Sequence, residues 1–127
     1  MKIVTLISRI LLGLIFLVFG SNGFLHFLPM GPLPPGPAGQ YLTALFQSHY
    51  VLVVCATQVL GGVLLLVNRY VPLALTILGP VVVNILSYHL FMAITGWQLA
   101  LFTTILWVIL VFRYRQAFAG IFVPRAA

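Results

Sequence analysis

The sequence predicts an all-α fold: an integral membrane four-helix bundle that forms a single domain over residues 1–127. Three observations favour this class. The chain is 63% hydrophobic and only 5% charged, whereas about a quarter of the residues of a water-soluble domain are charged. It contains four apolar segments of about the length that a membrane span needs. If the segments cross a membrane one after another, its basic residues all fall on the same side.

The four segments are separated by residues that end helices. About 20 apolar residues, at a rise of ~1.5 Å each, cross the hydrocarbon layer of a bilayer. The first segment follows basic residues as a signal peptide would, but it is long and lacks an Ala-x-Ala cleavage site, so we expect a retained span. The predicted spans are residues 10–28, 50–67, 71–92 and 96–112.

The connection between the first and second spans has two halves of different character. Its first half is rich in proline, which prevents a regular helix, so we expect a Pro-rich outer loop. Its second half, residues 40–47, places Tyr41, Leu42, Leu45 and Phe46 at helical spacing. This pattern predicts a short interfacial helix between the first two spans.

All charged side chains of the chain are basic, since it has six Lys and Arg residues and no Asp or Glu. On the predicted spans, all six lie on one side of the membrane, which the positive-inside rule makes cytoplasmic. We therefore expect a multi-pass protein of the bacterial cytoplasmic (inner) membrane with both termini in the cytoplasm. The six residues are scattered, so no nucleic-acid partner is expected. They are Lys2, Arg9, Arg69, Arg113, Arg115 and Arg125.

The absence of carboxylates excludes the acid–base pairs and acidic metal sites on which much enzyme chemistry depends. The single cysteine, Cys55, cannot form an intrachain disulfide, and its apolar surroundings predict a small buried packing residue. We expect no catalytic residue and no metal site. The protein is not expected to perform catalysis alone.

Polar side chains inside the predicted spans are the candidates for ligand binding, because hydrocarbon offers them no hydrogen-bond partners. Asn22 and His26 are four residues apart and would share one helical face, as would Asn84 and Tyr88. We expect a pocket between the first three spans, open toward the outer leaflet, in which amides and imidazoles meet a quinone headgroup or a lipid. The candidate residues are Asn22, His26, Gln58, Asn84, Tyr88 and His89.

Each of these residues also has an alternative interpretation. The amides could satisfy one another across helices, and His49 would be an interfacial histidine in contact with water and headgroups. Axial haem or metal ligation by His26 and His89 is disfavoured, because the chain has neither a CxxCH motif nor a carboxylate.

Glycine and proline predict how the helices pack. Gly13, Gly20, Gly61 and Gly62 would allow close approach of helix backbones. Pro80 lies near the middle of the third span and leaves a backbone carbonyl without its helical donor. We expect either a kink that widens the bundle beside Asn84 or a simple bend.

Three stretches of the chain resemble the DoxX family of small membrane proteins. These stretches are residues 9–29, with an Asn-Gly-Phe-x-His element, residues 58–75, with paired glycines, and residues 79–89, with a Pro-x-x-x-Asn element. The resemblance implies a four-helix membrane protein and an accessory subunit of a redox-linked membrane complex. Gln58 stands where many family members carry Glu, so a role that needs an ionisable carboxylate is not implied here.

The leading hypothesis is therefore a DoxX-like subunit without a cofactor of its own that contributes a quinone or lipid site. Its expected partners are membrane lipids and either another membrane protein or further copies of the same chain. One alternative is a structural or assembly factor for another membrane protein. Another is a small carrier for a neutral or amphiphilic solute, with the turn at Pro80 as its moving part.

Overall fold

The structure, a computed structural model, describes residues 2–28 and 31–125. Within these ranges the chain forms helices and no strand. The α-helices are α1 (Lys2–Leu25), α2 (Pro37–Gln47), α3 (Tyr50–Leu66), α4 (Val71–Phe91) and α5 (Trp97–Arg113), and a 3-10 helix, η1 (Arg115–Phe122), follows them. The all-helical fold predicted from the sequence is confirmed.

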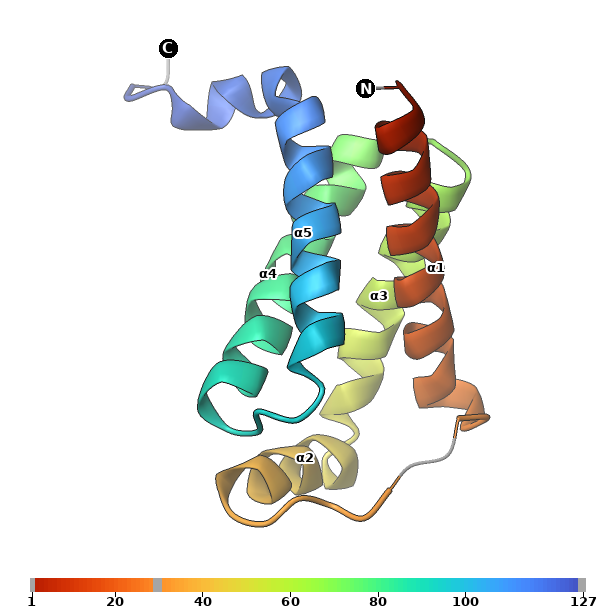
Figure 1. Cartoon of the computed structure of the whole chain (residues 1–127), viewed down its shortest axis with the longest axis vertical. Helices are drawn as coiled ribbons and strands as arrows, with labels where there is room; N and C mark the ends of the chain where they lie inside the picture. Colours follow the sequence, from red (N-terminus) through yellow and green to blue (C-terminus); the bar gives the residue numbers. More distant parts are fainter. Residues whose placement is uncertain (1, 29–30, 126–127) are drawn as a thin grey trace.

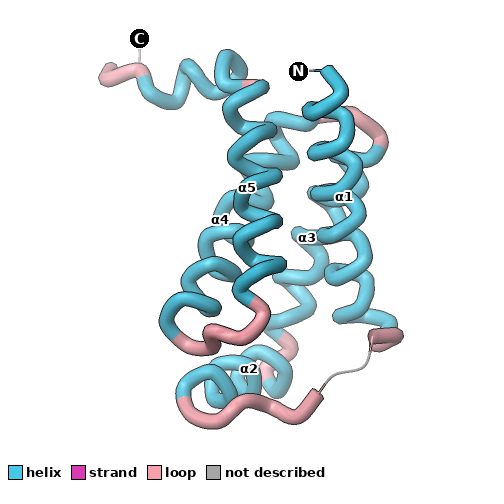
Figure 2. Tube along the Cα trace, in the orientation of Figure 1, coloured by secondary structure: helices cyan, strands magenta, loops and turns pink. Residues whose placement is uncertain are grey.

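Helices α1, α3, α4 and α5 pack side by side as a bundle in which each runs antiparallel to its neighbours (Figure 1). The most extensive contact is between α1 and α3. α3 also packs on α4, α4 packs on α5, and α5 closes the ring against α1. α2 lies across one end of the bundle, which we call the far end, and η1 turns away from α5 at the other (Figures 1 and 2). The loops of Figure 2 are confined to these two ends.

The close contact between α1 and α3 depends on glycine. A Cβ atom added to Gly62 would lie 2.8 Å from the carbonyl oxygen of Gly13, and one added to Gly20 would lie 2.9 Å from the carbonyl oxygen of Cys55. Both distances are too short for real atoms, so the two backbones touch at two levels. Cys55 itself is buried, as the sequence predicts.

Gly61, which precedes Gly62 in α3, lies against a different helix. A Cβ atom at Gly61 would lie 2.6 Å from the side chain of Leu78 in α4. Since adjacent residues of a helix point about 100° apart, Gly61 and Gly62 bring α3 close to α4 and α1 respectively. The prediction that these glycines permit close helix packing is confirmed.

The apolar core fills the half of the bundle that is remote from α2. Its largest fully buried side chains come from all four long helices: Leu12, Phe16, Leu65, Leu75, Leu78 and Leu110. The outward faces of the same helices are also apolar. They carry exposed side chains such as Leu14, Val53, Val83 and Ile105. Extensive exposed apolar surface on every side of a bundle is typical of contact with lipid.

Two helices, α1 and α4, are each long and apolar enough to cross a membrane. α3 and α5 reach that criterion only together with α2 and η1, to which they are joined by bends of 84° and 80°. The described chain therefore has two to four candidate spans, which is consistent with a membrane protein. A 17-residue helix such as α3 is about 26 Å long, near the lower limit for a span.

The six basic residues lie toward one end of the bundle, which we call the basic end. The start of α1, the turn between α3 and α4, and η1 all lie there (Figure 1). Arg9, in the third turn of α1, donates from Nη1 to the carbonyl oxygens of Leu65 and Leu66. These are among the last carbonyls of α3, and the Leu65 carbonyl also accepts from the backbone N–H of Asn68 at 3.3 Å. Arg9 adds a charged donor to this helix end and so caps α3.

Two helix boundaries differ from the expected ones. α1 begins at Lys2 and ends at Leu25, whereas its span was expected at residues 10–28. It ends early because His26 adopts a left-handed backbone with φ 52°. α2 begins at Pro37 instead of residue 40, because proline fits the first turn of a helix, where its missing N–H is not needed.

Pro80 is accommodated inside a continuous α4. Trp107 of α5 donates its Nε1–H to the carbonyl oxygen of Leu75 at 3.0 Å, within the turn that precedes the proline. Gly79 leaves room for this indole, since a Cβ atom there would lie 3.3 Å from Trp107 Cζ2. The Gly-Pro pair thus forms a contact point between α4 and α5, which the sequence alone did not indicate.

Candidate functional site: a cavity in the far half of the bundle

A cavity of about 340 Å³ lies between the four long helices. All four helices contribute to its walls, and Gly96 of the α4–α5 connection also lines it. Its lining is mainly apolar, with a few polar side chains, as is typical of sites for small organic ligands. The lining residues are Ile15, Phe16, Phe19, Gln58, Ile85, His89, Gly96, Leu99, Ala100 and Thr103.

Gln58 reaches the cavity from the middle of α3. Its Cβ lies where Gly20 of α1 allows close approach, since a Cβ atom added to Gly20 would be 2.9 Å away. Within the described residues, the Gln58 side-chain amide makes no hydrogen bond. An amide in an apolar cavity can both donate to and accept from a ligand.

His89 lies in the last turn of α4, and its ring is held in place on several sides. Nδ1 lies 3.0 Å from the carbonyl oxygen of Ala93. A carbonyl only accepts, so Nδ1 carries the proton of this bond, and Nε2 of the neutral ring is left as an acceptor. A Cβ atom at Gly96 would lie 3.2 Å from His89 Cε1, and Gly96 also has a left-handed φ of 83°.

Aromatic contacts connect His89 to the short helix α2. The Tyr88 ring meets the His89 ring edge-on, with centroids 5.1 Å apart. The centre of the Tyr41 ring of α2 lies 5.8 Å from the centre of the Tyr88 ring. α2 is therefore in contact with the element that positions His89, although it does not itself line the cavity.

α5 supplies a polar group that the sequence did not suggest. Thr103 lines the cavity and is 3% exposed. The pocket expected from the sequence involved only the first three spans, and this was incomplete. The sequence does place Thr103 on the same helical face as Leu99 and Ala100. Threonine is common in membrane helices, so this placement alone does not indicate a binding residue.

The six candidate residues fall into two groups. Gln58 and His89 line the same cavity, and Tyr88 contacts His89 from beside it. Asn22, His26 and Asn84 are not among the lining residues.

Asn22 and His26 complete the end of α1. The Asn22 side-chain Oδ1 accepts from the backbone N–H of Leu28 at 2.7 Å, and its carbonyl accepts from the N–H of His26 at 2.8 Å. His26 is exposed and lies beyond the last residue of α1. The expected shared helical face of these two residues is therefore wrong, because the helix ends between them.

Asn84 lies on the outer face of α4. It is exposed, and its Nδ2 donates to the carbonyl oxygen of Pro80 at 2.9 Å. This bond satisfies a backbone acceptor one turn earlier in the same helix. A widening of the bundle beside Asn84 is not what forms the cavity, because α4 lines it with Ile85 and His89.

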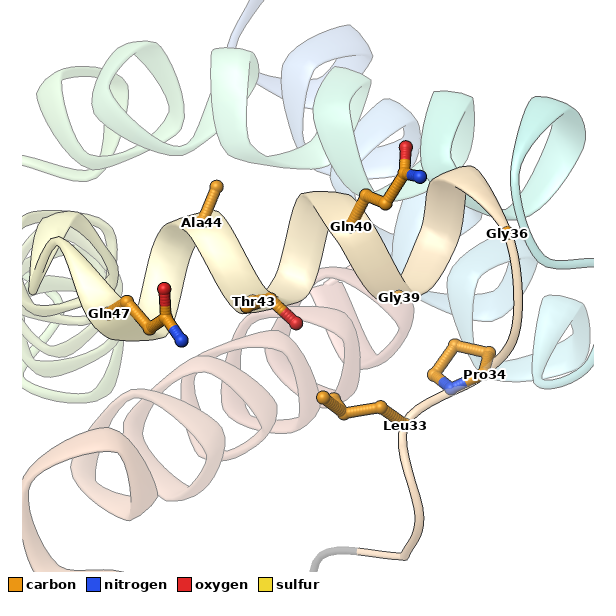
Figure 3. Close-up of a pocket in the computed structure, with 8 residues that line it drawn as sticks. All are labelled: Leu33, Pro34, Gly36, Gly39, Gln40, Thr43, Ala44 and Gln47. Carbon is orange, nitrogen blue, oxygen red and sulfur yellow. The ribbon is translucent and has the colours of Figure 1, made fainter.

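A second, larger hollow lies outside the bundle, between α2 and the loop that precedes it. It measures about 530 Å³ and is widely open. Figure 3 shows Gln40, Thr43 and Gln47 projecting from α2, with Leu33 and Pro34 on the loop. The loop packs tightly, since a Cβ atom at Gly39 would clash with the Pro34 carbonyl oxygen. Its openness makes it a weaker candidate than the cavity inside the bundle.

The described residues contain no group of three or more His, Cys, Asp or Glu side chains that could hold a metal ion. The chemistry of the cavity lies instead in hydrogen bonding by one amide, one imidazole and one hydroxyl within apolar walls. This arrangement can bind and orient a small amphiphilic molecule.

The fold and the cavity define a class: a small all-helical protein with two to four candidate membrane spans and an apolar cavity between its helices. No family model, curated protein or solved structure matches the chain.

Proposed function

We propose that this chain is a DoxX-like integral membrane protein whose cavity binds the headgroup of a quinone or a lipid, and that it serves as an accessory subunit of a redox-linked membrane complex. α1, α3, α4 and α5 would each cross the bacterial inner membrane, with the basic end in the cytoplasm. The observation that carries the proposal is the cavity of about 340 Å³ lined by Gln58 and His89.

The size and chemistry of the cavity favour an amphiphile with a compact polar ring. Its volume is near the lower end of the range for small-molecule sites, so a headgroup fits while an apolar tail passes outward between helices. A quinone carbonyl would accept from the Gln58 amide. The hydroxyl of the reduced form would donate to Nε2 of His89, which its bond to Ala93 leaves as an acceptor.

The position of the cavity supports the same assignment. It lies in the half of the bundle remote from the basic residues, and by the positive-inside rule that half would lie in the outer leaflet. A ligand that resides in the bilayer could enter laterally without crossing water. The chain supplies no redox group of its own, so oxidation or reduction of the ligand would occur in a partner.

The test is to purify the protein in a mild detergent, extract the bound lipids and quinones, and identify co-purifying chains. We expect stoichiometric quinone or a specific lipid. Gln58→Leu removes one polar contact and leaves the His89–Ala93 bond intact. The double variant, Gln58→Leu with His89→Leu, should lower ligand retention about tenfold or more.

Asn84→Leu is the matched control, because Asn84 is exposed and outside the cavity, so retention should be unchanged. Equal loss of ligand in Asn84→Leu and Gln58→Leu would contradict the site. A stoichiometric partner chain with no bound quinone or lipid would favour the assembly-factor alternative instead.

A further inference from the structure

The corner between α5 and η1 forms a basic hollow at the end of the bundle opposite the proposed ligand cavity. The chain turns by 80° here, and residues 113–117 line a hollow of about 280 Å³. Arg113 and Arg115 lie on either side of Tyr114, and all three line it. Two arginines therefore line one concave surface.

Contacts with neighbouring groups constrain both arginines. Arg115 donates from Nη1 to the carbonyl oxygen of Phe112 at 2.9 Å, and its guanidinium lies 4.6 Å from the centre of the Phe112 ring. The Arg113 guanidinium lies 5.9 Å from the centre of the Tyr114 ring. These contacts use one of the five N–H donors of Arg115 and leave the others for an external acceptor.

No acidic side chain of the chain is available as a counter-charge for this pair. The chain has six basic residues and no Asp or Glu, so no side-chain carboxylate of its own can neutralise them. Arginine pairs bind phosphate and carboxylate groups through several parallel N–H donors. The expected ligand is therefore an anion.

Apolar side chains further along η1 favour an anion that carries an apolar part. Phe118 of η1 packs against the bundle core, which fixes one face of η1. Beyond it, Ile121 and Phe122 are 68% and 80% exposed. A short helix that has arginines at and just before its start and exposed apolar side chains at its end, on a segment that bends away from α5, matches an amphiphile at the membrane interface.

We propose that the α5–η1 corner binds the headgroup of an anionic phospholipid, with its phosphate on Arg113 and Arg115. The apolar side chains of η1 contact the acyl region. Free phosphate would use the guanidinium groups but not Ile121 and Phe122, so the complete surface fits a lipid. Basic residues at this level of a bundle attract anionic lipids by about 1 kcal/mol each.

The experiment is native mass spectrometry of the detergent-purified protein, titrated with phosphatidylglycerol, with phosphatidylcholine and with inorganic phosphate. We expect phosphatidylglycerol to bind at least tenfold tighter than phosphatidylcholine, and inorganic phosphate not to compete at equal concentration. Arg113→Gln with Arg115→Gln should weaken phosphatidylglycerol binding about 30-fold, the combined effect of two basic residues.

Arg69→Gln is the matched control, because it removes a positive charge from the same end of the bundle outside the hollow. It should leave the affinity within about twofold. Equal affinity for the two lipids, or an equal loss in Arg69→Gln, would overturn the proposal, and so would competition by inorganic phosphate. If the double variant does not fold, Phe122→Ser tests the apolar part, and unchanged lipid affinity in that variant would also overturn it.

Discussion

At the residue scale, the side chain that most directly joins two helices at the basic end is Arg9. It is half-buried in α1 and donates to the carbonyl oxygens of Leu65 and Leu66 at the end of α3. Helix ends in a membrane environment cannot rely on water for these acceptors. In the sequence Arg9 is a topology signal, and in the structure it also stabilises the packing of α1 on α3.

We predict that Arg9→Gln lowers the free energy of unfolding by about 2 kcal/mol, since hydrogen bonds to charged groups contribute about 1.5–3 kcal/mol. Thermal or denaturant unfolding in detergent measures this. Arg69→Gln, at an exposed turn, should change stability by less than about 0.5 kcal/mol. Equal effects of the two substitutions would show that the Arg9 contacts contribute nothing specific.

Trp107 gives a second prediction at this scale. Trp107→Phe keeps most of the ring but removes the Nε1–H donor to the Leu75 carbonyl. The stability should fall by about 0.6 kcal/mol, the average for polar contacts between membrane helices, and by no more than about 1.7 kcal/mol. Trp97→Phe, at the exposed start of α5, is the control. A stability loss in Trp97→Phe as large as in Trp107→Phe would contradict the role of this bond.

At the scale of elements, the glycine contacts decide how α3 fits between its neighbours. The Gly62→Ala methyl would meet the backbone of α1, at Gly13 and Leu17, which cannot move aside independently. We expect Gly62→Ala to destabilise the protein by about 1–3 kcal/mol, as for overpacked cores. Unfolding in detergent is the measurement.

Gly120→Ala is the control for this substitution, because a Cβ atom there meets nothing within 4 Å. Its stability should match that of the original chain. If Gly62→Ala were as stable as Gly120→Ala, the α1–α3 backbone contact would be looser than the structure indicates.

The bounds of the elements show which signals the sequence carries. Pro37 and the glycine before it mark the start of α2, and the apolar runs mark α3, α4 and α5 closely. The end of α1 was harder to place, because the hydrophobic run continues past Leu25 although the helix does not. It ends at the left-handed backbone of His26, and the Asn22 side chain then accepts from the N–H of Leu28.

At the scale of the whole molecule, charge and topology are linked. The basic residues expected on one side of a membrane do lie toward one end of the bundle (Figure 1). That this end is cytoplasmic remains a prediction. It requires α3 and α5 to cross the membrane although each has only 17 residues.

A reporter fused after Ala127 tests this topology. A cytoplasm-specific reporter should be active and a periplasm-specific one inactive, because the positive-inside rule retains Arg113 and Arg115 in the cytoplasm. The converse fusion, within the loop near Gly36, should show the opposite pattern. Periplasmic activity at both sites would mean an even number of spans between Gly36 and Ala127 instead of three, and would overturn the four-span arrangement.

The sequence by itself determined the helical class, the approximate positions of the long helices and the common end of the basic residues, because hydropathy and charge are local properties that add along the chain. It also identified Gln58 and His89 as polar groups. Their meeting in one cavity, the contribution of Thr103 and the exclusion of Asn84 were decided only by the tertiary structure. These depend on how each helix is rotated about its axis, and that rotation is set by contacts such as Gly62 on Gly13 and Trp107 on Leu75, between residues far apart in the chain.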